Sequence, residues 1–174
     1  MIDIYWIHNP MDVEKWTPEL IPLAKSGQIQ TIGVSNHNLA EIKRVNEILN
    51  PEGLKVSAVQ NHYSLLHRSS EQAGILDYCK ENGIIFYAYM VLEQGALTGK
   101  YNQENPFPEG TGRGDSYNPY LKELENLVGE LKRIGTEHDA SLAQIKLSVE
   151  EVSYLEKLGD ETGVKTLREW EKEM

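Results

Sequence analysis

Four short runs of apolar, β-branched and aromatic residues recur at nearly even spacing along the first half of the chain. They are Ile4–Ile7, Thr31–Val34, Val56–Val59 and Ile84–Tyr89, about 27 residues apart. A strand, a helix and two short loops need about that length, and nearly continuous apolar strands are typical of a parallel sheet covered by helices. The spacing therefore predicts an α/β protein with the order β-α-β-α-β-α-β.

Helix start and stop signals lie between these runs. Asp12 can cap a helix that ends before Gly27, Asn38 and Glu41 form a capping box, and a helix opened by Ser69 can close at Gly83. After residue 118 we expect a helix with a leucine-rich face, and a last helix from about residue 148 to residue 163. The leucine-rich face is made of Leu121, Leu124, Leu127, Leu131 and Ile134.

Composition predicts one ordinary domain. The chain has 174 residues, of which 40% are hydrophobic and 25% charged. We divide residues 1–174 into four βα-type units over 1–101, a loop over 102–118 and C-terminal helices over 119–174. The net charge of −10 disfavours nucleic acids and anionic membranes as partners. A single cysteine, Cys79, and the lack of an apolar leader or a long apolar run make the cytoplasm the expected compartment.

Polar residues stand at the carboxyl end of each expected strand, where α/β proteins usually place their chemistry. These residues are His8, the pair Ser35 and Asn36, the triplet Gln60, Asn61 and His62, and Tyr89. Any one of them taken alone is best explained as a polar loop residue. Four successive strands that end in this way indicate a shared site.

The motifs "IDIYWIHNP", "IGVSN", "VQNHYSLLHR" and "YAYMVLEQGALTGKY" resemble, in order and spacing, consecutive strand ends of the aldo-keto reductases. The resemblance implies part of an eight-stranded (β/α) TIM barrel and a family reaction in which NADPH or NADH reduces a small-molecule carbonyl. It assigns His8 to the catalytic tetrad, where a neutral imidazole polarises the carbonyl. It assigns the nicotinamide carboxamide to Ser35, Asn36 and Gln60, and the stacking on the nicotinamide ring to Tyr89.

The departures from the family pattern concern catalysis and the cofactor. The family carries the histidine on its fourth strand, so the first three strands, and with them the tetrad Asp, Tyr and Lys, have no counterpart here. After Ile145 the segment with the eighth strand and the basic 2′-phosphate clamp is also missing, and Met90-Val91-Leu92 replaces the commoner Ser-Pro-Leu. We therefore expect impaired catalysis and weak or absent cofactor binding. The alternative is a non-enzymatic half-barrel scaffold or self-assembling protein.

Other chemistry-bearing residues have simpler interpretations. His62 and His67 lack metal-ligand spacing, which favours polar loop or helix-surface positions and no metal site. Cys79 follows an apolar helical pattern, which predicts a buried, inert thiol.

Four parallel strands cannot close an eight-stranded barrel, so both edges and one apolar face of the sheet stay open. The exposed set includes Ile4, Trp6, Ile32, Val34, Val59 and Ile85 or their neighbours, depending on the register. We expect a homo-oligomer that covers these surfaces. The alternative is a rearranged open sheet whose C-terminal helices fold over the exposed face.

Overall fold

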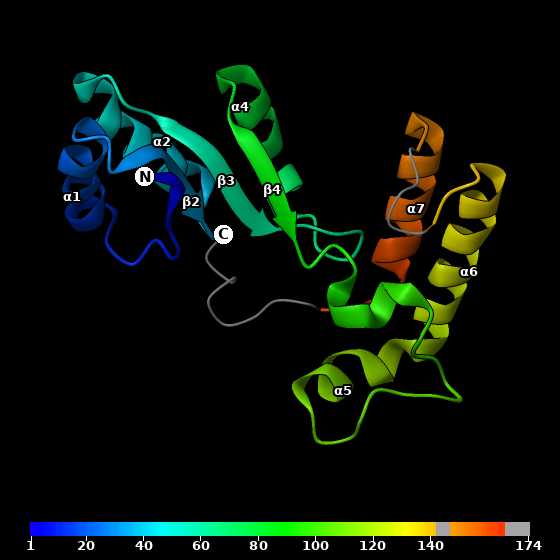
Figure 1. The fold of residues 1–174 in the computed structure, drawn as a ribbon. Coiled ribbons are helices and arrows are strands. Elements are labelled where there is room, and N and C mark those ends of the chain that lie inside the picture. The colour runs from blue at the N-terminus through cyan, green and yellow to red at the C-terminus, as the bar shows by residue number, and fades with distance from the viewer. Residues whose placement is uncertain (142–146, 166–174) are drawn as a thin grey trace. The chain divides into compact units, whose positions relative to one another are not determined.

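The computed structural model describes residues 1–141 and 147–165, and its contacts divide the chain into two compact units (Figure 1). The first unit contains Met1–Tyr63 and Arg68–Tyr89. The second contains Ser64–His67 and, among the described residues, 90–141 and 147–165. The composition predicted one domain and gave no indication of the division at Tyr89. No helix among the described residues is long and apolar enough to cross a membrane.

The first unit is built on a four-stranded parallel sheet in the order β1-β2-β3-β4. The strands are β1 (Ile2–Ile7), β2 (Ile29–Ser35), β3 (Val56–His62) and β4 (Ile85–Tyr89). Each apolar run of the sequence forms one of them, which confirms the predicted order. β1 and β2 begin two residues earlier than expected, and β3 extends three residues further, to His62.

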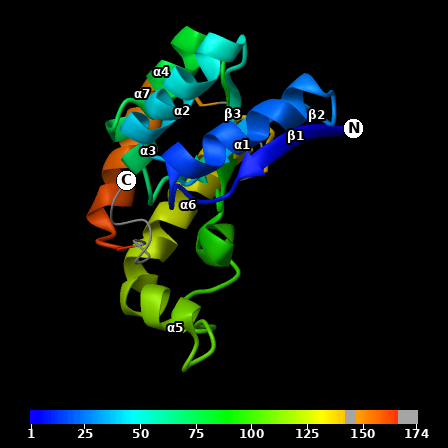
Figure 2. The same cartoon turned by 90° about the vertical axis from the view of Figure 1, so that its left-hand side faces the viewer.

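The helices of the first unit cover one face of this sheet (Figure 2). They are α1 (Val13–Lys25), α2 (Leu39–Leu49) and α4 (Ile75–Asn82). Ile32, Val34 and Val59 of the sheet are buried in one core with residues of all three helices. Burial of this face removes a large apolar area from water and is the main source of stability for the unit.

Local capping signals set most of the helix ends. Asp12 accepts a hydrogen bond from the backbone of Lys15 at the start of α1, and the capping box of α2 forms as predicted. The expected helix from residue 69 to residue 83 is instead two helices, α3 (Ser69–Gln72) and α4. Gly74, with φ of +76°, separates them, because a left-handed residue cannot continue a right-handed helix.

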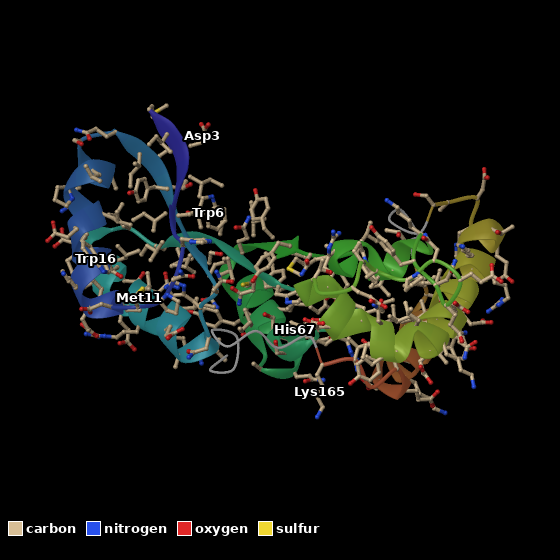
Figure 3. All side chains as sticks on the ribbon, turned by 90° about the horizontal axis from the view of Figure 1, so that it is seen from below. Asp3, Trp6, Met11, Trp16, His67 and Lys165 are labelled. Carbon is tan, nitrogen blue, oxygen red and sulfur yellow. The ribbon has the colours of Figure 1, made fainter. Side chains whose placement is uncertain are left out.

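Among the described residues of this unit, only the sheet's own side chains cover its opposite face. Trp6 points away from α1 (Figure 3), and its ring lies over Gly33, the residue beside it on β2. Trp6 meets the ring of Tyr87 edge-on, with 5.7 Å between the centroids, while Ala58 on β3 is buried. Two aromatic residues from the outer strands therefore fill the space above two small residues of the inner strands.

The second unit is helical. The 3-10 helices are Glu93–Thr98 and Asn118–Tyr120, and the α-helices are α5 (Gly112–Tyr117), α6 (Leu121–Glu137) and α7 (Val149–Glu161). All five residues of the predicted leucine-rich face of α6 are buried, and Ser148 caps α7 through the capping box. The prediction of a loop over 102–118 is wrong at its end, because Thr111 caps α5. The predicted junction at Ile145 lies outside the described residues.

A buried carboxylate joins the short segment Ser64–His67 to these helices. Glu93 accepts hydrogen bonds from the hydroxyls of Ser64 and Tyr117, the latter over 2.8 Å. Gly159 of α7 packs against the same segment, since a Cβ there would lie 2.6 Å from the carbonyl oxygen of Leu65. These contacts explain why the segment belongs to the second unit although it follows β3.

Replacing Gly33 with alanine tests the packing of Trp6. The new Cβ would lie 2.5 Å from the ring, so we expect Gly33→Ala to lower the free energy of unfolding by about 1–3 kcal/mol, measured by urea titration. Gly129→Ala is the control, because nothing lies within 4 Å of that exposed helical site and alanine favours helix by up to about 1 kcal/mol. Equal effects of the two variants would contradict this packing.

Candidate functional site

Three residues at the carboxyl ends of neighbouring strands form one row across the open face of the sheet. Ser35 on β2 lies beside Gln60 on β3, and Gln60 lies beside Tyr87 on β4. Neighbouring residues in a parallel ladder point to the same side, so these side chains share the face that Trp6 occupies. The next row toward the strand ends holds His62 and Tyr89. Polar and aromatic groups thus gather at one end of a face whose other end is apolar.

Asn36 joins the ends of three strands through its side chain. Its amide nitrogen donates to the carbonyl oxygen of His8 at 2.9 Å and to Oδ1 of Asn9 at 3.2 Å. Its Oδ1 accepts a hydrogen bond of 2.7 Å from the hydroxyl of Tyr89. The backbone is left-handed, with φ of +61°, a conformation that asparagine tolerates better than most residues.

Tyr89 is held on a second side by an aromatic contact. The rings of His62 and Tyr89 are stacked, with 5.5 Å between the centroids and 23° between the planes. His62 is fully buried at the end of β3, so the predicted loop or helix-surface position is wrong for this residue. His67 lies in the loop between β3 and α3, as predicted, although it is buried. The position of His62 follows from the extra length of β3, which places it on the same side as Gln60.

Ser35 and Gln60 keep their side-chain hydrogen-bonding groups available. No described residue makes a hydrogen bond to the hydroxyl of Ser35 or to the side-chain amide of Gln60, although Ser35 is nearly buried and Gln60 is half-buried. A hydroxyl and an amide both donate and accept. Their position beside each other is suited to a planar polar group of a ligand.

His8 contributes its backbone to this arrangement and presents an exposed side chain just after β1. The structure therefore brings together Asn36, Tyr89 and the carbonyl of His8 by direct contact, and Ser35 with Gln60 by register. The imidazole of His8 makes no hydrogen bond to a described residue. For Asn9 and His62, which also belong to the site, no role was predicted from the sequence. A polar residue next to a predicted strand end was the only signal for them.

A buried histidine supports the strand end from the helix side. Nδ1 of His37 donates to the carbonyl oxygen of Ser35 at 2.7 Å, and Asn61 donates to the carbonyl of His37 at 2.9 Å. Burial lowers the pKa of His37, although its bond to Ser35 acts in the opposite direction. Its Nε2 has no partner among the described residues, so no described acceptor stabilises a proton on that nitrogen.

The remaining reactive groups do not form a second site. Cys79 is buried in the core, and burial raises the pKa of its thiol to about 11, which confirms the predicted inert thiol. In the described part of the chain, no three His, Cys, Asp or Glu residues are grouped so that they could hold a metal ion.

The fold, with polar residues at the carboxyl ends of successive parallel strands, is that of part of a (β/α) barrel. The model of the Aldo/keto reductase family matches residues 1–148, and the chain belongs to this family. It is 31% identical over 156 residues to the aldo-keto reductase yakc [NADP(+)] of Schizosaccharomyces pombe, covering 84% of this chain and 44% of that protein. It is 29% identical over 129 residues to the chloroplastic pyridoxal reductase of Arabidopsis thaliana, covering 74% and 35%.

Solved structures agree with the fold. A glycerol dehydrogenase from Gluconobacter oxydans superimposes with a TM-score of 0.81 at 20% identity, over 97% of this chain and 62% of that chain. The chain spans less than half the length of the two curated relatives named above. The four strands therefore correspond to part of the relatives' barrel.

The buried His37 predicts that acid weakens the fold. In the unfolded chain the ring protonates near its ordinary pKa of 6.5, whereas in the folded chain it protonates only at lower pH. The unfolded state therefore binds more protons as the pH falls below about 6.5, and the free energy of unfolding decreases. Urea titrations between about pH 7 and pH 5 should show this slope, and His37→Asn, which can still donate to Ser35, should reduce it. An unchanged slope in the variant would contradict the assignment.

Proposed function

We propose that this chain is an aldo-keto reductase-like protein that keeps the nicotinamide side of the cofactor site and is catalytically impaired. The observation that supports the proposal is the pair Ser35 and Gln60, adjacent in register and next to the ring of Tyr89. No described residue makes a hydrogen bond to either of their side chains. The cofactor is NADPH or NADH, and binding is weak. The compartment we propose is the cytoplasm.

The state of Asn36 decides how a nicotinamide carboxamide would be held. Both N–H groups of its amide are engaged by His8 and Asn9, and Oδ1 already accepts one hydrogen bond. Asn36 can therefore only accept one more hydrogen bond, from the ligand's amino group. The ligand's carbonyl oxygen is left to the donors of Ser35 and Gln60. Tyr89, fixed by Asn36 and His62, supplies the flat face beside the ring.

Turnover needs groups that this chain does not supply at matching positions. A bound reduced nicotinamide would supply the hydride. His8 can donate a hydrogen bond to a carbonyl and polarise it. Protonation of the resulting alkoxide needs a general acid, and Tyr5, Tyr63 and Tyr87 do not follow the family's motif for that acid. The chain alone therefore binds the cofactor but does not reduce carbonyls at an appreciable rate.

A non-enzymatic half-barrel scaffold is the second candidate function. The observation that favours it is the open sheet face, on which Ile85 keeps 58% of its surface exposed. A monomeric protein seldom leaves such an apolar surface uncovered without a binding role.

Gln60 provides the test of cofactor binding. We expect Gln60→Ala to weaken binding of NADH and NADPH about tenfold, which is about 1.4 kcal/mol, in a fluorescence titration of the reduced nicotinamide. Gln30→Ala is the matched control, since Gln30 is exposed on β2 toward its other end. The two cofactors should bind with similar affinity because the basic 2′-phosphate clamp has no counterpart. Absence of any binding would instead favour the scaffold.

Catalysis has a separate expected outcome. With the general acid missing, the chain alone should show no appreciable carbonyl-dependent oxidation of NADPH or NADH, and His8→Ala should leave that background unchanged. Absorbance of the reduced nicotinamide with a panel of small aldehydes measures it. Steady oxidation that disappears in His8→Ala would overturn the proposed impairment.

A further inference from the structure

The open face of the sheet is divided along the strands into a polar and an apolar half. Ser35, Gln60 and Tyr89 lie toward the carboxyl ends, whereas the amino-terminal half is apolar. Two apolar side chains of that face are strongly exposed, namely Ile85 at 58% and Tyr87, which lies in the row of Ser35 and Gln60, at 40%. Ile85 lies in the same row as Trp6, Gly33 and Ala58, so the exposed groups border the packed aromatic pair.

Both edges of the sheet lack most of the features that usually block pairing, and Asp3 of β1 is the one charged residue on them. β1 and β4 are the outer strands, and no other described strand pairs with either. Their sequences, IDIYWI and IFYAY, contain no lysine and no proline, and the one register shift of the sheet lies between β2 and β3. Edge strands that face water normally carry such residues or bulges. These two strands are therefore suited to pairing with further strands.

A second copy of the chain suits this surface better than a single foreign strand. A foreign strand can pair with one edge and leaves the other edge open. A copy rotated by half a turn about an axis parallel to the strands places its β4 beside β1 and its β1 beside β4, with all strands parallel. Four strands from each copy make eight, the number at which side chains fill a parallel barrel.

Charge does not oppose this contact. The chain carries a net charge of −10, yet Asp3 is the only charged residue in β1 and β4 together. The repulsive charges therefore lie elsewhere, where they oppose unlimited association rather than the pairing of these strands.

We infer that the chain forms a twofold symmetric homodimer in which the open faces cover each other and β1 of one copy pairs with β4 of the other. The axis keeps the carboxyl ends of all strands at one mouth. Each copy then lines half of that mouth, and Ser35 and Gln60 of one copy face a cavity completed by its partner. Formation of this dimer does not require cofactor binding.

Light scattering coupled to size exclusion across the micromolar range tests the assembly. We expect a dimer. Ile85→Lys should raise the dissociation constant of this dimer at least tenfold, because a charge would be buried in the interface without a partner. Val149→Lys is the control, since Val149 is 78% exposed on α7 in the second unit. A cooperatively melting monomer at every concentration, or a dimer that Ile85→Lys and Val149→Lys affect equally, would overturn the inference.

Cross-linking tests the strand pairing and does not depend on the folding of Ile85→Lys. Cys79 is the one cysteine of the sequence and is buried, so Ile2→Cys and Ile85→Cys each introduce a single reactive thiol. Both lie near the amino ends of outer strands. A short bismaleimide should join an Ile2→Cys chain to an Ile85→Cys chain in a mixture and should join neither variant to itself. Cross-links within either variant alone, or none in the mixture, would overturn the pairing.

Discussion

A parallel sheet has two apolar faces, and the helices of this unit bury only one of them. Ile32, Val34 and Val59 pack beneath α1, α2 and α4, and this core determines which way every strand presents its side chains. Because side chains alternate along a strand, the same core places Trp6, Ser35 and Gln60 on the opposite face. The position of the candidate site is therefore a consequence of how the helix side is packed.

The open face is stabilised partly by its own aromatic residues. Trp6 can lie across the sheet only because Gly33 has no side chain, and Tyr87 reaches it from the other outer strand. This packing buries Ala58 but leaves Ile85 in contact with water. This face is thus neither fully buried, as a core is, nor polar, as an ordinary surface is. The proposed dimer would cover its apolar half and pair its two edges at the same time.

Asn36 links the ends of the strands to the candidate site. Its left-handed backbone turns the chain at the end of β2, and its amide group holds the ends of β1 and β4 in place. The hydrogen bonds that make Asn36 a structural residue also restrict what it can offer a ligand. The side chains of Ser35 and Gln60, by contrast, make no hydrogen bond to any residue that the structure describes.

Membership in the aldo/keto reductase family, four parallel strands, the caps of α1 and α2 and the buried face of α6 could all be predicted from the sequence. Each depends on a motif or on periodicity within a few neighbouring residues, as the capping box of α2 shows. The burial of Cys79 followed from the same local pattern.

Tertiary structure alone decided which apolar set faces the helices, because both alternating sets of β1 and β4 are rich in apolar residues, Asp3 apart, and only the register chooses between them. It also placed His62 behind Tyr89, gave Glu93 its buried hydroxyl partners and tied Asn36 to Tyr89, 53 residues further along the chain. These contacts join segments that meet only after the sheet has formed. Local sequence patterns therefore predict the individual strands and helix caps, but not the register that brings distant side chains together.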